Sequence, residues 1–552
     1  MKLILKNGIV YDPANGINGE KMDIFIKDGK IVDRIWFGAK TIDVNNKLVM
    51  PGGFDIHAHI AGGKENIGRM FRPEDGLKKH YSKKNGLRGG SGNSVPSVFP
   101  TGYEYSRLGY TTAITPAMPP LYARHTHHEL NDIPNIDKMA FPLYDGNWFV
   151  MKCIAEDDEE SLQSYVSWLL KATKGYAVKI VNPGGTEAWG WGRNIKELDQ
   201  QVPFFNVTSR EIINNLVDAC EQLKLPHSVH IHGNNLGNPG NFETALQTID
   251  SIKNVKSNNH RPVLHLTHLQ FFSYGGDSWK TFGSGAEEVA KSVNKRDVSI
   301  DTGNVIFGDT TTMTADGPLE YSLHSLSRLK WVNRNVEAET APGLTPVIYS
   351  PKSPVNTVQW AVGLELALLI DSDKVVITTD HPNGGPFTRY PELMTMLMSK
   401  KYRDSVDVHK VVDKRSSLPA IDRELTIYEI AKLTRTNPAR VIGLKNKGHL
   451  GKGADADVAV YDLNPHEVDS SDYARIEKAL SNSYLTIKGG RIVCSRGEIV
   501  DQLKGDTYWV NSSVDKDIEK DLEEYFKKYY SVRLSNYSVK EEELAKSKVI
   551  SV

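Results

Sequence analysis

The sequence contains few cysteines, and this scarcity limits the cofactors that the chain can hold. Only three cysteines occur in 552 residues, at positions 153, 220 and 494, and none is close enough to another to form a CxxC pair. An iron–sulfur cluster or a zinc ribbon within the chain is therefore excluded, and a disulfide framework is not expected. The odd count and wide spacing suit a reducing cytoplasm, which is the compartment we expect.

The sequence also lacks an excess of charge and a long apolar run. It has 67 basic and 68 acidic residues, so no global field attracts nucleic acid or an anionic membrane. The longest nearly apolar run, at 360–370, contains Glu365 and is shorter than the ~20 residues that span a bilayer. We predict a buried helix there and no membrane span. The start of the chain has too few apolar residues in a row for a signal peptide.

The distribution of β-rich runs predicts two structural parts. Residues 2–49 contain short β-rich runs separated by turn signals, which indicate a small antiparallel sheet. Between about 51 and 439, β-rich runs alternate with amphipathic segments, as in parallel strands with crossover helices. Short strands return after 444, including DTYWVNS at 506–512, and we expect them to join the N-terminal strands. We predict an α/β fold with a TIM-like (β/α)8 barrel, 51–439, inserted into a β-sandwich made of 1–50 and 440–512.

The last part of the chain, 513–552, is predicted to be a charged helical extension. Tyr525, Phe526, Tyr529 and Tyr530 are a heavy aromatic load for a free tail. We therefore expect the extension to dock on a neighbour, with a frayed tail as the alternative.

The strongest local signal is the pair of histidines in PGGFDIHAHI, at 51–60. His57 and His59 are two residues apart after a β-run, so their imidazoles point the same way and can converge on one metal ion. A chance HxH is common in a chain with 17 histidines. Its position at the junction between the small sheet and the barrel favours a metal site.

Several later strands of the predicted barrel also end in polar residues, at the edge where such a barrel carries its chemistry. These residues are Lys179 in YAVKIVNPGG, His230 and His232 in SVHIHGNN, His265 and His268 in LHLTHLQ, and Asp380 in ITTDHPNGG. A lysine on a buried strand is costly as an ammonium, so burial lowers the pKa of Lys179 and makes the neutral amine available to carbon dioxide. A lysine that snorkels from the strand end is the alternative. His268 is nearer the polar strand end than His265, which we expect to be a core histidine.

The order of these residues resembles the amidohydrolase superfamily, as do NPARVIGL at 437–444 and LGKGADADVAVYDLNP at 450–465. The resemblance implies two divalent metals, with zinc as the expected ion, although the same ligands accept several metals. It implies a ligand set of His57, His59 and Asp380 on one ion, His230 and His268 on the other, and carboxylated Lys179 (N6-carboxylysine) as the bridge. Water bound there loses its proton more easily, and Asp380 is the candidate catalytic proton carrier. Of His230 and His232, the family places its ligand first and a substrate contact second.

Five longer stretches, at 63–75, 115–138, 230–249, 266–276 and 379–394, resemble the amidohydrolase-type subunit family of formylmethanofuran dehydrogenases. That resemblance implies condensation of formate with the amine of methanofuran to give N-formylmethanofuran, or the reverse hydrolysis. The implied partners are molybdenum or tungsten formate dehydrogenase-like subunits and iron–sulfur subunits. These would carry the redox half, so we expect neither an iron–sulfur cluster nor molybdopterin in this chain.

Four residues are candidate substrate contacts. Lys64, in a Gly-rich loop after the HxH, could capture formate, with a solvated loop lysine as the alternative. His232, Asn234 and Asn235 could position the formyl oxygen or the amine, although Asn-Asn-Leu-Gly is also a common turn. The RHTHH stretch ending at His128 follows Pro-Pro in loop-like sequence. Its histidines are interpreted either as surface residues or as a substrate contact from a loop, and the sequence leaves both interpretations open.

Three other functions fit the sequence in part. A free-standing metal hydrolase of cyclic amides or N-acyl amino acids would use the same ligands. A component of a bacterial formyltransferase/hydrolase complex would share much of the chain. A non-enzymatic scaffold is disfavoured because the HxH, the lysine, both histidines and the aspartate are all present.

Overall fold

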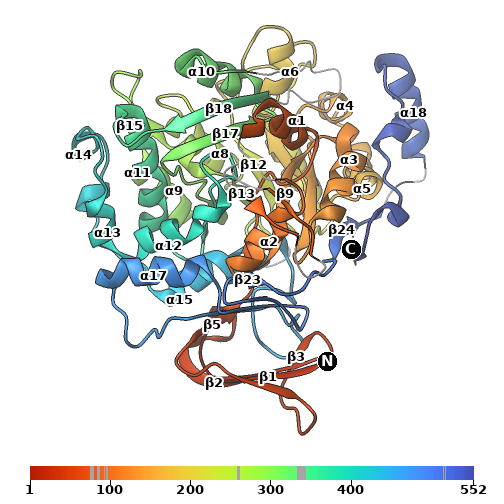
Figure 1. The fold of residues 1–552 in the computed structure, drawn as a ribbon. Helices are drawn as coiled ribbons and strands as arrows, with labels where there is room; N and C mark the ends of the chain where they lie inside the picture. Colours follow the sequence, from red (N-terminus) through yellow and green to blue (C-terminus); the bar gives the residue numbers. More distant parts are fainter. Residues whose placement is uncertain are drawn as a thin grey trace.

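The computed structural model describes the chain except for residues 75–79, 84–86, 92–93, 95–96, 258–260, 332–342, 514 and 516. The fold is α/β with parallel sheets, as predicted, and Figure 1 shows a β-rich part below a larger part of strands and helices. Within the described ranges, no helix combines the length and the apolar character needed to cross a membrane.

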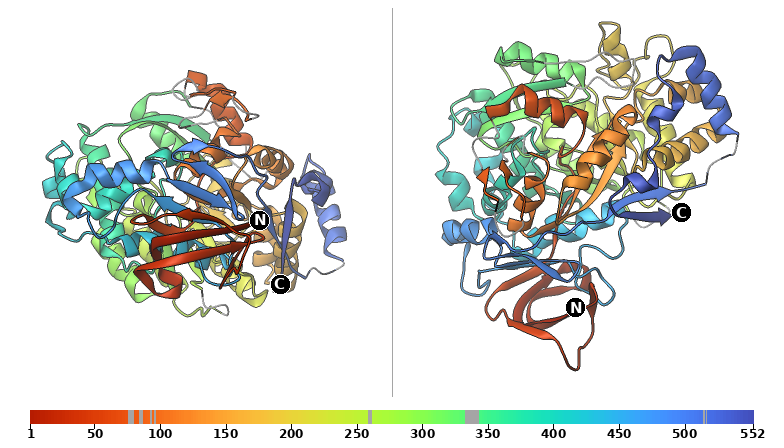
Figure 2. Two further views of the ribbon diagram at one scale, coloured as in Figure 1. Left: turned by 60° about the horizontal axis from the view of Figure 1, so that its bottom comes forward. Right: turned by 45° about the vertical axis from the view of Figure 1, so that its right-hand side comes forward.

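Strands from both ends of the chain form one nine-stranded sheet, the terminal sheet. Its order is β23-β22-β21-β20-β5-β1-β2-β3, and β4 pairs with β1. The strands are β1 (Lys2–Asp12), β2 (Ile17–Lys27), β3 (Lys30–Val32), β4 (Lys40–Asp43), β5 (Leu48–Pro51), β20 (Val458–Tyr461), β21 (Leu485–Lys488), β22 (Arg491–Ser495) and β23 (Glu498–Ile499). The two halves meet where β20 pairs antiparallel with β5. The left view of Figure 2 shows the two colours of this sheet side by side.

Eight strands between these ends lie in two parallel sheets, one with the order β6-β9-β10 and the other with the order β11-β12-β13-β16-β19. They are β6 (Gly53–Asp55), β9 (Tyr110–Met118), β10 (Asp137–Pro142), β11 (Lys179–Val181), β12 (Val229–His232), β13 (Leu264–Leu266), β16 (Val298–Asp301) and β19 (Val375–Val376). Single parallel bridges, Leu143 with Lys179 and Ala58 with His381, join the two sheets into a ring. The strands are almost entirely buried, as expected when both faces of a parallel sheet are covered.

Helices connect these strands and cover the outside of the ring (Figure 1). They include α1 (Gly63–Phe71), α2 (Pro100–Arg107), α3 (Ala123–Asp132), α4 (Trp148–Ala155), α5 (Glu159–Thr173), α6 (Gly185–Gly190), α7 (Ser209–Gln222), α8 (Phe242–Ser251), α9 (Ala286–Lys295), α10 (Gly317–Ser327), α11 (Pro354–Leu369), α12 (Tyr390–Met398) and α16 (Asn437–Ile442). The helix predicted at 360–370 is part of α11 and is buried, as expected. An antiparallel pair of strands, β17 (Gly308–Thr314) and β18 (Gly343–Tyr349), follows β16, with α10 between the two in the chain.

The end of the chain differs from the prediction in two respects. The strand expected in the terminal sheet, β24 (Thr507–Asn511), instead pairs with β10 of the ring and with β25 (Ser547–Ser551). The extension is also not wholly helical, since α18 (Ile518–Tyr529) is followed by β25. Its aromatic residues dock on the chain itself, with the Tyr525 ring 5.3 Å from that of Phe149 and the Tyr530 ring 4.9 Å from that of Trp148.

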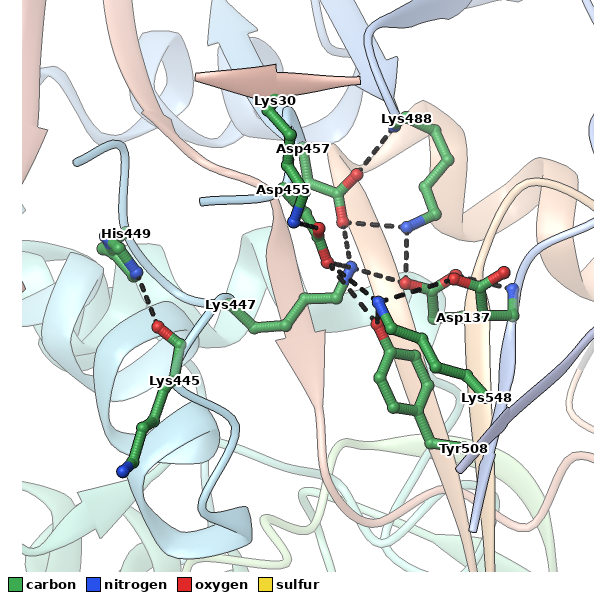
Figure 3. Close-up of polar contacts among 12 residues, drawn as sticks. Lys30, Asp137, Lys445, Lys447, His449, Asp455, Asp457, Lys488, Tyr508 and Lys548 are labelled. Carbon is green, nitrogen blue, oxygen red and sulfur yellow. Dashed lines mark hydrogen bonds and ion pairs between the residues drawn. The ribbon is translucent and has the colours of Figure 1, made fainter. Parts of the chain in front are cut away.

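A buried ion network connects the terminal sheet to the ring (Figure 3). Lys488 Nζ lies 2.7 Å from Asp137 Oδ2 and 2.8 Å from Asp457 Oδ2, and Lys447 contacts the same two carboxylates. Asp137 is on β10, whereas Lys488 is on β21. Burial opposes ionisation, yet the two ammonium groups hold the pKa of Asp137 well below its usual range. The network therefore orients two layers that are distant in sequence.

We expect Asp137→Asn to lower the free energy of unfolding by about 3–5 kcal/mol at neutral pH, because two buried ammonium groups would share the remaining carboxylates. The ion pair stabilises the fold fully above the ordinary aspartate pKa of about 3.9 and is lost as the pH falls toward the depressed folded pKa. Urea unfolding at several pH values measures both effects. The variant should lose less stability than the wild type between neutral and acidic pH.

Asp28→Asn is the control, because Asp28 is an exposed carboxylate that pairs with the N-terminus. Its unfolding midpoint should match that of the wild type. Equal midpoints for the wild type and Asp137→Asn would show that the network does not stabilise the fold.

Candidate metal centre

The ring places three of the predicted ligands together at the carboxyl ends of its first and last strands. His57 and His59 follow β6, and Asp380 follows β19. Asp380 Oδ1 lies 3.0 Å from His57 Nε2 and 3.2 Å from His59 Nε2. A hydrogen bond of 2.7 Å from the His59 amide to the His381 carbonyl holds the two strand ends in this position. Among the described residues, these three form the one His, Cys, Asp or Glu group whose ligand atoms lie within 4.8 Å of one another.

A buried aspartate behind His57 was not predicted from the sequence. Asp301, at the end of β16, lies with Oδ2 3.1 Å from His57 Nδ1 and 3.2 Å from His265 Nε2. Its other oxygen accepts hydrogen bonds from the Thr378 hydroxyl, at 2.6 Å, and the His268 amide, at 2.9 Å. Burial opposes ionisation, but the two histidines hold the pKa of Asp301 well below its usual range. Because Asp301 contacts Nδ1 of His57, the other ring nitrogen, Nε2, is the one that faces Asp380.

Lys179 and His268 lie beside this group without joining it. Lys179 Nζ donates to Thr267 Oγ1 at 2.9 Å, and that hydroxyl lies 3.3 Å from His268 Nε2. The His268 ring centroid is 5.1 Å from that of His57. Burial lowers the pKa of Lys179 to about 8, against the opposing charges of nearby aspartates. The neutral amine is thus accessible near physiological pH, as the buried strand position predicts.

The two histidines of β12 have different surroundings. His230 is paired in register with Lys179, and its ring packs 4.7 Å from that of His265. Neither ring nitrogen of His230 has a hydrogen-bond partner among the described residues. His232 Nε2 instead lies 3.0 Å from Asp316 Oδ2, and the ring is 4.7 Å from that of His268. His265, which was expected to be a core histidine, is fully buried, and its ring nitrogens contact Ser299 and Asp301.

The donor set fits a divalent metal. Imidazole nitrogens and carboxylate oxygens are common ligands of such ions. Buried side-chain nitrogens are normally hydrogen-bonded, yet both nitrogens of His230 and Nδ1 of His268 lack partners in the described structure. The backbone around the site is also strained, with positive φ angles of 45° at Asn182, 36° at His268 and 47° at Asp380. Such conformations in non-glycine residues cluster at functional sites.

The predicted substrate contacts differ in their surroundings. Lys64, on α1, is buried, and its Nζ has no hydrogen-bond partner in the described ranges. Burial lowers the pKa of Lys64, and Glu65, Asp380, Glu320 and Asp145 oppose that shift. The Lys64 ammonium therefore interacts electrostatically with carboxylates of the site, including Asp380.

The two asparagines have local partners. Asn234 Nδ2 donates to Asn182 Oδ1 and to the Pro183 carbonyl, so it joins two loops. Asn235 has a φ of 57° and accepts a hydrogen bond from the Asn238 side chain. A cavity of about 480 Å³ begins at His232 and Asp380, and neither asparagine is among the described residues that line it.

The RHTHH stretch is helical, which corrects the loop expected there. These residues lie in α3, and Pro119 and Pro120 precede the helix, where proline is tolerated. His127 is buried against the Thr173 carbonyl at 2.9 Å. His125 and His128 face Glu129 and Glu543, so the three rings do not converge.

The model of the amidohydrolase family matches residues 40–494, which is most of the chain and includes every predicted ligand. The chain belongs to the amidohydrolase family. Protein FwdA of Methanocaldococcus jannaschii is 53% identical over 100% of this chain and 99% of its own length. This relation confirms the predicted resemblance to the amidohydrolase-type subunit family of formylmethanofuran dehydrogenases.

A second relative belongs to a bacterial complex. The corresponding component of the formyltransferase/hydrolase complex Fhc of Methylorubrum extorquens is 34% identical over 93% of this chain and 91% of its own length. The crystal structure of the FhcABCD complex with methylofuran contains a chain that matches with a TM-score of 0.91 at 32% identity, covering 100% of both chains. The two chains therefore share one fold over their whole lengths.

We expect Asp301→Asn to weaken Zn²⁺ binding about 10–100-fold, because an amide cannot provide the negative charge that orients and polarises His57. Competition with a chromophoric chelator measures the affinity, and thermal unfolding shows whether the variant is folded. Asp12→Asn is the matched control, because Asp12 is a buried carboxylate in the terminal sheet. A variant that is less stable but binds Zn²⁺ as the wild type does would limit Asp301 to a structural role.

Proposed function

We propose that this amidohydrolase condenses formate with the primary amine of methanofuran to give N-formylmethanofuran, and hydrolyses that amide in the reverse direction. The convergence of His57 and His59 on Asp380, which lines a cavity, is the observation that carries the proposal. We further infer that the ring is a (β/α)8 barrel, 51–439, inserted into a β-sandwich from the terminal segments. The C-terminal sandwich segment, predicted as 440–512, ends before β24, because that strand pairs with the ring.

The proposed centre holds two divalent ions, with zinc as the expected species. His57, His59 and Asp380 would hold one ion, and His230 and His268 the other. Lys179 would bridge them as a carbamate, for which its pKa of about 8 makes the neutral amine available. The ions would polarise the carbonyl oxygen and make a bound water more acidic. His232 is the alternative to His230, because it lines the cavity whereas His230 packs on His265.

Asp380 is the proposed proton carrier. In hydrolysis, its carboxylate takes a proton from the attacking water, and the same proton passes to the nitrogen as the carbon–nitrogen bond breaks. Condensation reverses these transfers and releases one water. Asn383 Nδ2 donates to Asp380 Oδ2 at 2.8 Å, so one carboxylate oxygen is oriented and Oδ1 remains toward the histidines. His232, held by Asp316, would contact the substrate nitrogen or oxygen at the cavity end.

The cavity has the composition expected for an amine with a long organic tail. Beyond His232 and Asp380, its described lining includes Phe271, Leu319 and Tyr349. Pockets of this size with mostly apolar walls and a few polar groups are typical small-molecule sites. The formyl group would therefore lie at the polar end, and the furan ring and tail along the apolar walls.

The proposed setting is a complex with molybdenum or tungsten formate dehydrogenase-like subunits and iron–sulfur subunits. The greater identity to FwdA than to the Fhc component favours this setting over a bacterial formyltransferase/hydrolase complex. A free-standing hydrolase of cyclic amides or N-acyl amino acids has no separate observation in its favour.

Metal content and formate release from N-formylmethanofuran test the proposal together. The wild type should contain about two divalent ions per chain, and Lys179→Ala should lose both the second ion and the activity. Lys138→Ala is the matched control, because Lys138 is also a buried strand lysine whose pKa burial lowers to about 8. One ion per chain and undiminished activity in Lys179→Ala would contradict the binuclear centre.

Lys64→Met should raise the KM for formate in the condensation about 10–100-fold, because the anion loses its contact with a buried ammonium. The kcat should change less, since Lys64 is not a proposed proton carrier. Lys171→Met, on the exposed side of α5, is the control. An unchanged KM in folded Lys64→Met would remove Lys64 from the substrate site.

A further inference from the structure

A second hollow, separate from the metal centre, is lined by aromatic side chains that remain partly exposed. This aromatic groove has a volume of about 810 Å³ and lies between α4, the segment 191–206 and α18. The seven aromatic residues that line it are Trp148, Phe149, Trp191, Phe204, Phe205, Tyr525 and Tyr529. In Figure 1, α18 lies at the right-hand side, beside α4 and α5.

Three of these side chains are costly to leave in water. Phe204 is 81% exposed, Trp191 is 56% exposed and Tyr529 is 48% exposed. Scattered apolar residues at a surface are normal, but several large aromatic residues around one hollow indicate a binding surface. Phe204 also has a φ of 69°, an uncommon conformation for a bulky residue, and its ring packs 4.7 Å from that of Trp191.

The groove is a built feature, because a buried carboxylate fixes its indole rings. Glu187, on α6, is 3% exposed and accepts hydrogen bonds from Trp148 Nε1 at 2.7 Å and Trp191 Nε1 at 2.9 Å. The opposite wall is α18, held by packing of Tyr525 against Phe149. Rings held in this way lose little side-chain entropy on binding, as is typical of interface anchors.

The charges around the groove indicate the chemistry of the occupant. Its lining contains five acidic residues, Glu156, Asp158, Glu187, Asp521 and Glu524, and two basic residues, Lys152 and Lys528. Lys152 is already paired with Glu156 at 2.6 Å. A groove with aromatic walls and an excess of carboxylates favours cationic side chains, since these bind both ring faces and carboxylates.

Two elements that line the groove, α4 and α6, begin just after the carboxyl ends of ring strands β10 and β11. The predicted ligands His57, His59 and Asp380 follow the carboxyl ends of β6 and β19, so these elements start at the end of the ring that carries the metal centre. A partner bound there would lie at the face that carries the chemistry, as expected for a protein that exchanges a small substrate with this chain.

We propose that the aromatic groove binds a basic segment of another protein in the complex, with an arginine or lysine placed against Trp191 and Phe204. This inference rests on the proposed function for the assembly but not on the reaction. A basic segment, rather than an acidic or neutral one, is the occupant that the excess of carboxylates fits.

Assembly with the co-expressed formate dehydrogenase-like and iron–sulfur subunits tests the groove. Phe204→Ser and Trp191→Ser together should weaken assembly at least about 30-fold, measured by native mass spectrometry and by titration of the purified subunits. Asp521→Lys with Glu524→Lys should also weaken assembly, and the wild-type affinity should fall with added salt. Trp36→Ser with Phe37→Ser is the matched control, because these residues are each 80% exposed and are not part of the groove.

Formate release and metal content of each isolated variant distinguish this proposal from the proposed function. Both should equal the wild-type values, since none of the substituted residues lies in the metal centre. Assembly that is unchanged in the groove variants, or equally weakened in the control, would overturn the proposal. So would a change in the self-association of the isolated chain, which would make a second copy the occupant.

Discussion

The closure of the parallel ring is the constraint on which the rest of the structure depends. His57 and Asp380 are far apart in sequence, and they meet because the first strand end pairs with the last through Ala58 and His381. The hydrogen bond from the His59 amide to the His381 carbonyl fixes the two ends at the level where their side chains converge. A shift of one residue in either strand would turn these side chains to the other face. The site therefore depends on register as much as on residue type.

The terminal sheet also supports this closure. Pro51 ends β5 and pairs with Val458 of β20, while β6 begins the ring two residues later. The buried ion network of Lys447 and Lys488 with Asp137 and Asp457 fixes the same junction from the side of β10. Removal of one partner from such a network is costly because it leaves a buried charge uncompensated, even though desolvation offsets much of the ionic attraction in the intact network. The chain ends thus hold the ring whose closure forms the site.

The sequence was sufficient to predict those features that depend on local pattern. His57 and His59 share one face of an extended segment, and polar residues at strand ends meet at one edge of a parallel sheet. Asp301 was missed because it ends an ordinary buried strand, and its partners, His57 and His265, belong to two other strands. Nothing in its own neighbourhood in sequence marks it. Its role is visible only once the strands are adjacent.

The position of β24 in the fold also could not be predicted from the sequence. Alternation identifies Thr507–Asn511 as a strand, but the choice of β10 as its neighbour is non-local. The docking of α18 on α4 and α5 required the same tertiary information, although its aromatic content had indicated that it would pack somewhere. The loop expected around His127 was wrong, because the Pro-Pro pair that precedes this stretch, Pro119 and Pro120, lies before the helix and does not interrupt it.

The buried acids of the site divide into two groups, and their surroundings explain the division. Burial raises the pKa of Asp145 and Asp316 to about 7, since hydrogen bonds lower it only in part. Asp301 and Asp380 are buried as deeply, but the adjacent histidines hold their pKa well below the usual range. Negative charge is therefore concentrated where the imidazoles converge. This arrangement of carboxylates and imidazoles would suit the proposed metal ions on one side and, through Lys64, the proposed formate on the other.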